Sequence, residues 1–110
     1  MIAYQNGDIY EQVKKIPLMG EYDAVVVGGG VAGFGAAVAI GKRGRKVLLI
    51  EATSALGGLV TMGLVNIPLD FVSGIGYEMM TELEKIEGHW HRNTNMEKHK
   101  LVLDRMIHKY

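Results

Sequence analysis

The sequence contains no cysteine. This absence excludes a disulfide framework, a redox-active Cys-x-x-Cys motif, thiolate ligation of an iron–sulfur cluster and attachment of a flavin through cysteine. Because the chain carries no redox-active thiol, any redox chemistry in which it takes part must reside in a bound cofactor.

The chain also lacks an excess of charge of either sign, since 12 basic residues balance 12 acidic residues. This balance provides no electrostatic attraction for nucleic acid or for an anionic membrane surface. No apolar run approaches the roughly 20 residues of a transmembrane helix, and residues 1–15 lack the basic start and apolar centre of a signal peptide. We therefore expect no nucleic-acid partner, no membrane partner and a cytoplasmic location.

What the chain does have is glycine in a specific pattern, Gly28-x-Gly30-x-x-Gly33. The apolar run Ala24 to Val27 precedes it and predicts a buried parallel strand, while the alanine-rich run Val31 to Lys42 follows it and predicts a helix. In a dinucleotide-binding βαβ unit the first glycine permits the tight turn, the second lets the backbone approach a pyrophosphate, and the third lets the helix pack closely on the strand.

The phosphates of a dinucleotide are expected at the unpaired N–H groups and positive dipole end of this helix. The expected phosphate-binding positions are Gly28, Gly30, Val31, Ala32 and Gly33. The pattern alone is weak, because 15 of the 110 residues are glycine. Its position between a strand and a helix makes it specific.

Glu51 closes a second predicted strand, Lys46 to Ile50, at about the spacing from the glycines at which a carboxylate reaches the adenosine ribose. We therefore expect Glu51 and the adjacent Ala52 to contact the ribose, the alternative for Glu51 being a solvated strand end. Because no arginine follows at Ala52 or Thr53, the 2′-phosphate of NADP is the least favoured ligand.

A second glycine-rich stretch, Leu56 to Gly63, follows the second strand and contains the doublet Gly57-Gly58. A simple NAD-binding domain does not require a second glycine loop there. The doublet is expected to approach the cofactor, the alternative being a flexible turn between a strand and a helix.

These residues resemble the N-terminal segment of the FAD-dependent oxidoreductases. The resemblance covers about residues 16–110 and rests on Ile16-Pro17, Glu21-Tyr22-Asp23, Gly28-Gly29-Gly30, Glu51, Leu56-Gly57-Gly58, Thr61 and Gly63. It implies a Rossmann-like FAD-binding segment of the α/β class with parallel strands followed by helices, and Gly57 and Gly58 near the FAD diphosphate. Ala55 and Leu59 stand where related flavoproteins often carry arginine, so no arginine contact to the cofactor is expected.

The chain is sized for one domain and contains no internal repeat. We expect residues 1–20 to form an N-terminal extension with a short helix, because Asp8 to Glu11 has the form of a capping box. Residues 21–110 are expected to form the FAD-binding segment. Within it, residues 52–76 predict a long loop with brief structure around Leu64 to Ile67, and two helices are expected at Tyr77 to Glu87 and from Met96 to the end.

The remaining polar residues predict no further site. His89 and His91 supply two ligands from one loop, whereas a zinc site needs three or four, so no metal is expected. Glu78, Glu82 and Glu84 have the pattern of a solvated helix face. No residue can be assigned as a catalytic acid, base or nucleophile.

Two parallel strands are fewer than a Rossmann sheet needs, so the segment is expected to be an incomplete domain. The resemblance implies that it anchors the ADP half of FAD for flavin-mediated hydride transfer, with an unknown small-molecule substrate and with a second copy or a complementary chain as a possible partner. The alternatives are a non-catalytic nucleotide-binding or interaction fragment and an NAD-binding module. Turnover by this chain alone is not expected.

Overall fold

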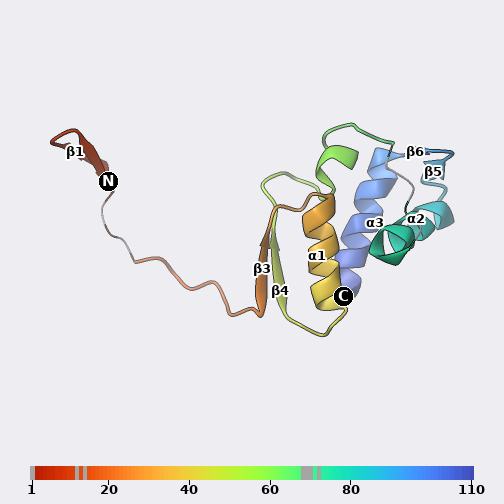
Figure 1. Cartoon of the computed structure of the whole chain (residues 1–110), viewed down its shortest axis with the longest axis horizontal. Helices are drawn as coiled ribbons and strands as arrows, with labels where there is room; N and C mark the ends of the chain where they lie inside the picture. The colour runs from red at the N-terminus through yellow and green to blue at the C-terminus, as the bar shows by residue number, and fades with distance from the viewer. Residues whose placement is uncertain (1, 12, 14, 68–70, 72) are drawn as a thin grey trace.

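The structure, a computed structural model, describes residues 2–11, 13, 15–67, 71 and 73–110. The elements in the described part of the chain follow one another as a hairpin, a βαβ unit, a short 3-10 turn, a helix, a second small hairpin and a final helix (Figure 1). Their bounds are β1 Ile2–Gln5, β2 Asp8–Glu11, β3 Ala24–Val27, α1 Val31–Gly41, β4 Val47–Ile50, η1 Gly58–Val60, α2 Gly74–Lys85, β5 His89–Trp90, β6 Asn93–Thr94 and α3 Met96–Lys109.

The βαβ unit is present where the sequence predicts it. Strands β3 and β4 are parallel and pair from Ala24 opposite Val47 to Val27 opposite Ile50. Helix α1 packs against both strands, and Figure 1 shows it lying along one face of the sheet. The predicted α/β class with parallel strands followed by helices is confirmed. Gly44, at a φ of 69°, adopts the left-handed conformation that glycine often has just after a helix ends.

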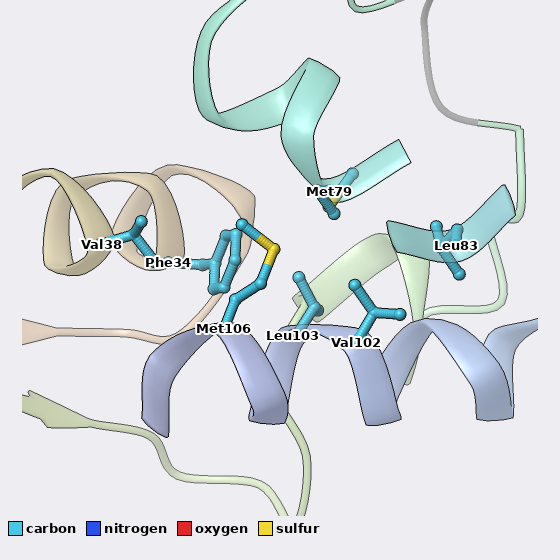
Figure 2. Packing of buried hydrophobic residues seen from close by; sticks show 7 residues of the cluster. All are labelled: Phe34, Val38, Met79, Leu83, Val102, Leu103 and Met106. Atoms are coloured by element: carbon cyan, nitrogen blue, oxygen red, sulfur yellow. The ribbon is translucent and has the colours of Figure 1, made fainter. Parts of the chain in front are cut away.

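The hydrophobic core lies between the three helices. Figure 2 shows side chains of α3 directed towards α1 and α2. The buried cluster consists of Phe34, Val38, Met79, Leu83, Val102, Leu103 and Met106. Met80 and Ile86 pack against this cluster while partly exposed.

Val102, Leu103 and Met106 form the apolar side of α3, whereas Leu101 is 42% exposed. The buried positions His99, Val102, Leu103 and Met106 follow the helical period of a core-facing stripe. The imidazole of His99 occupies the first position of that stripe and is fully buried. A search for apolar residues alone does not find this position.

The short helix predicted from the capping box at Asp8 to Glu11 is wrong. Residues Ile2–Gln5 and Asp8–Glu11 instead form an antiparallel hairpin. Its two turn residues, Asn6 and Gly7, have φ angles of 54° and 85°. Two positive φ angles define the turn that Asn-Gly favours between antiparallel strands, so this dipeptide outweighs the helix signal. In Figure 1 the hairpin lies apart from the α/β part of the chain.

Helix α2 begins at Gly74, earlier than the expected Tyr77. The sequence does not indicate this first turn, because its two glycines have low helical propensity. Packing explains Gly76, since a Cβ there would lie 2.3 Å from the ring of Phe71. The brief structure in the preceding loop is also displaced from the prediction. It is the 3-10 turn at Gly58–Val60 rather than a segment around Leu64 to Ile67.

Two polar segments differ from the sequence prediction. His89 and His91, expected in one loop, lie in and beside the hairpin β5–β6, where Trp90 is 73% exposed. Glu78 does not lie on a solvated face. Its carboxylate accepts hydrogen bonds from the Lys42 ammonium and from the Tyr110 hydroxyl, the latter at 2.5 Å. The bond from Lys42, followed by the bond from Tyr110, lowers the pKa of Glu78.

Candidate functional site

The first glycine loop connects β3 to α1. Gly28 has a φ of 98°, a conformation that favours glycine, and its N–H donates to the Ile50 carbonyl at 2.7 Å. A Cβ on Gly33 would lie 1.8 Å from the Gly28 carbonyl oxygen and 3.4 Å from the Val26 side chain. The predicted close approach of the helix to the strand is therefore present, and Gly33 is required by it.

Gly30 differs from Gly33 because, apart from Gly30 itself and its two chain neighbours, no atom lies within 4 Å of a Cβ built on it. Its φ of −63° and ψ of −178° are open to any residue. Gly30 is the N-cap of α1, where neither a side-chain cap nor an acidic residue in the first turn compensates the helix N-terminus. The next two residues, Val31 and Ala32, are exposed. The N-terminus of α1 therefore combines open space at Gly30 with backbone N–H groups that no side chain caps.

The Glu51 carboxylate lies against the first glycine loop from the end of β4. One oxygen accepts the Gly29 N–H at 2.6 Å. The other accepts the Thr53 N–H at 2.8 Å and lies 2.9 Å from the Thr53 hydroxyl. The hydrogen bonds from the Thr53 and Gly29 N–H groups, with smaller contributions from the Thr53 hydroxyl and the Ala52 backbone, lower the pKa of Glu51. The carboxylate is thus kept ionised and held in one orientation.

The second glycine loop docks directly on the first. The Gly57 N–H donates to the Gly29 carbonyl at 2.8 Å, and Gly57 also pairs with Gly30 as an isolated parallel bridge. A Cβ on Gly58 would lie 3.1 Å from the Gly30 Cα. The structure therefore brings together the predicted positions Gly28, Gly30, Gly33, Glu51, Gly57 and Gly58 at one end of the parallel strands.

Three residues that build this end of the molecule have no individual role in the sequence prediction. Gly29 stands at the variable position of the motif, yet a Cβ there would lie 2.5 Å from the Leu56 side chain and 3.0 Å from the Glu51 carboxylate. Thr53 orients Glu51. Thr61 is buried beneath the second loop. The role of Thr53 could have been predicted, because Thr53 lies two residues after Glu51 in the sequence. The roles of Gly29 and Thr61 depend on tertiary contacts, which the sequence does not show.

The described residues contain no group of three or more His, Cys, Asp or Glu side chains able to hold a metal ion. Over the same residues, no helix is long and apolar enough to cross a membrane. A cavity of about 340 Å³ lies between α1, β4 and α3, with Arg45, Lys46 and Ile107 among its lining residues. None of the residues lining it comes from the glycine loops, so it is separate from the candidate site.

The parallel strands, the glycine turn at the helix N-terminus and the acidic residue ending the second strand define a dinucleotide-binding βαβ unit. Comparison with known families identifies its kind. The sequence profile described as FAD dependent oxidoreductase matches residues 23–110, and the chain belongs to this family. FAD is the cofactor that this membership implies.

Individual relatives match over shorter stretches. The NADH oxidase of Thermoanaerobacter brockii is 44% identical over 57 residues, 52% of this chain and 8% of the relative. The pseudooxynicotine dehydrogenase of a Pseudomonas species is 46% identical over 56 residues, 51% of this chain and 11% of the relative. The digeranylgeranylglycerophospholipid reductase of Methanospirillum hungatei is 37% identical over 70 residues, 64% of this chain and 15% of the relative.

The matched stretches therefore span only a small part of these curated relatives, between 8% and 15% of their lengths. No solved structure matches the chain.

Proposed function

We propose that residues 21–110 bind the ADP half of FAD at the junction of the two glycine loops. The observation that carries this proposal is the contrast between two glycines of the motif. Packing inside the protein requires Gly33, whereas nothing in the described structure surrounds a Cβ at Gly30. A glycine that the protein itself does not need, at an uncapped helix N-terminus, fits a position where a pyrophosphate approaches the backbone.

The surrounding residues fit the rest of the ADP group. The N–H groups at Val31, Ala32 and Gly33 belong to the first turn of α1, which has no intrahelical acceptors for them. The ionised Glu51 carboxylate can accept hydrogen bonds from ribose hydroxyls, with Ala52 beside it. Gly57 and Gly58 would bring the second loop to the diphosphate, because Gly57 already pairs with Gly30.

When bound, FAD supplies two-electron chemistry with hydride transfer, and the protein's part is to bind and orient it. This chain's residues would hold the cofactor at its ADP end. The chain spans a small part of its relatives' length. No acid or base in the described residues is assigned to that reaction, and the substrate is left open.

The test uses two alanine variants that add the same methyl group to the same helix region. Gly30→Ala places it at the proposed pyrophosphate position, and Gly35→Ala places it in α1, where no atom lies within 4 Å of it either. We expect Gly30→Ala to weaken FAD binding by roughly tenfold or more, measured by quenching of flavin fluorescence, which corresponds to about 1.4 kcal/mol. Gly35→Ala should bind FAD like the parent protein.

The same titration with NAD distinguishes the remaining alternative. A parent chain that binds NAD and not FAD would support the NAD-binding module. Unchanged FAD affinity in folded Gly30→Ala would contradict the assigned pyrophosphate position. Thermal melting supplies the folding control, since an N-cap exchange of glycine for alanine is expected to cost about 1 kcal/mol or less.

A non-catalytic interaction fragment is favoured by one observation, the uncovered face of the sheet. Opposite α1, Val25, Val27 and Ile50 are 55%, 80% and 45% exposed. An apolar parallel sheet open on one face is unusual, because such sheets are normally covered on both faces. We propose that a second copy or a complementary chain covers this face. Light scattering behind size-exclusion chromatography tests the second copy, and a strictly monomeric chain would argue against it.

A cytoplasmic location remains a prediction, which fractionation of the source cells would test.

A further inference from the structure

Thr61 is one of the few polar side chains buried in the described part of the chain, with an exposed fraction of 1%. It follows the 3-10 turn η1 and carries no charge. Its hydroxyl donates to the Leu56 carbonyl at 2.5 Å. Its methyl group and hydroxyl both lie 2.7 Å from a Cβ built on Gly57, so the side chain fills the space behind that glycine.

The carbonyl bound by Thr61 and the N–H of Gly57 belong to one peptide group, because a peptide joins the C=O of Leu56 to the N of Gly57. A trans peptide is planar, and its C=O and N–H point in opposite directions. No cis peptide occurs in the described residues. Thr61 therefore holds one end of this peptide at 2.5 Å, and the Gly29 carbonyl holds the other end at 2.8 Å.

This peptide connects the two glycine loops. If it rotated, the Gly57 N–H would leave Gly29, and the bridge between Gly57 and Gly30 would open. We infer that Thr61 is a positioning residue for the cofactor site: its hydroxyl fixes the Leu56–Gly57 peptide and thereby sets the second glycine loop against the first. This inference rests on the proposed FAD site, but the peptide geometry can be tested without FAD.

Two substitutions separate the hydroxyl from the methyl group. Thr61→Val keeps the shape and removes the donor of this part-buried hydrogen bond, leaving the Leu56 carbonyl without its Thr61 partner, whereas Thr61→Ser keeps the donor and removes the methyl group. Thr81→Val is the matched control, since the Thr81 hydroxyl also donates to a backbone carbonyl, that of Tyr77 at 2.9 Å, but within α2.

The experiment has two readouts on the full chain. Amide hydrogen exchange by NMR reports on the Gly57 N–H without cofactor, with helix α3 amides as an internal reference. Titration with FAD reports on the assembled site. For Thr61→Val we expect exchange at Gly57 to be faster by roughly tenfold relative to α3, and FAD binding to be weaker by a similar factor, because the part-buried Leu56 carbonyl loses the hydrogen bond that fixes the peptide. Thr61→Ser and Thr81→Val should stay within about twofold of the parent on both readouts.

Unchanged protection of the Gly57 amide in folded Thr61→Val would overturn the inference. So would a folded Thr61→Ser that loses protection at Gly57, since the methyl group would then be the essential part. Thr61→Ser still decides the question if Thr61→Val does not fold. A parent chain that fails to bind FAD would contradict the proposed function, and the exchange at Gly57 would still test the role of Thr61.

Discussion

Adding one methyl group at either of two positions in α1 should have opposite effects on stability. Gly33 and Gly35 lie one turn or less apart in the same helix, and alanine is the better helix former at both by about 1 kcal/mol. The surroundings of the added methyl group differ. At Gly35 it meets no atom within 4 Å, whereas at Gly33 it would lie 1.8 Å from the Gly28 carbonyl oxygen.

The collision at Gly33 involves backbone and cannot be relieved by rotating a side chain. Restoring an ordinary contact requires α1 to move away from β3 by roughly 1.5 Å, or the Gly28 peptide to rotate, and close-packed interiors resist such shifts. The preceding peptide, between Val27 and Gly28, carries the N–H that bonds to the Ile50 carbonyl, and its rotation would weaken that bond. Overpacking of this kind costs about 1–3 kcal/mol and sometimes more.

After the gain in helix propensity, we expect Gly33→Ala to destabilise the chain by up to about 2 kcal/mol and Gly35→Ala to stabilise it by about 0.5–1 kcal/mol. For a domain of this size, 1 kcal/mol shifts Tm by about 4–8 °C. The assay is thermal and urea unfolding followed by circular dichroism. Equal stability of the two variants would refute the reasoning, because only the close approach of α1 to Gly28 distinguishes them.

Three further predictions concern single residues. Burial lowers the pKa of His99 below 6.5, so the folded state favours the neutral imidazole. The contribution of His99 to stability is therefore present above pH 6.5 and is lost as the pH falls below that value. The urea midpoint of the parent should decrease between about pH 7.5 and about pH 5.5, and that of a folded His99→Gln variant should decrease less. Asn95→Ala removes the cap that accepts the Lys98 N–H at 3.0 Å and should cost about 1 kcal/mol in urea unfolding, so an unchanged midpoint would count against this cap. Glu51→Gln should weaken FAD binding by roughly tenfold at pH 7, because a charge-assisted acceptor is lost. Equal affinity of the variant and the parent in the titration would contradict a contact between Glu51 and the ribose.

The βαβ unit could be predicted from the sequence because its signals are local. The apolar runs at β3 and β4 and the glycine turn between β3 and α1 each lie within a few residues, and observed boundaries differ from the expected ones by two residues or fewer. The N-terminal hairpin shows the limit of local reading. Asp8 and Glu11 satisfy a capping box, but Asn6-Gly7 satisfies a hairpin turn, and the two patterns compete for the same residues.

The joining of the two glycine loops could not be predicted, because it depends on contacts between distant residues. The bond from Gly57 to Gly29 and the contact of Leu56 with the first loop exist only once β4 is paired beside β3. The same is true of Glu51, whose predicted position at the strand end is confirmed but whose bond to Gly29 has no local signal. Its role at a ribose stays a prediction.

The three glycines of the motif are glycine for three different reasons, and this distinction decides what the motif can show. Gly28 adopts a left-handed backbone conformation, and Gly33 admits no Cβ beside the Gly28 carbonyl. Both requirements belong to the fold and would persist in a protein that had lost its cofactor. Gly30 has ordinary dihedral angles and open space around it, so the fold alone would accept alanine there. Within this motif, Gly30 is therefore the position that points to a bound dinucleotide, and alanine variants at Gly30 and Gly33 separate binding from folding.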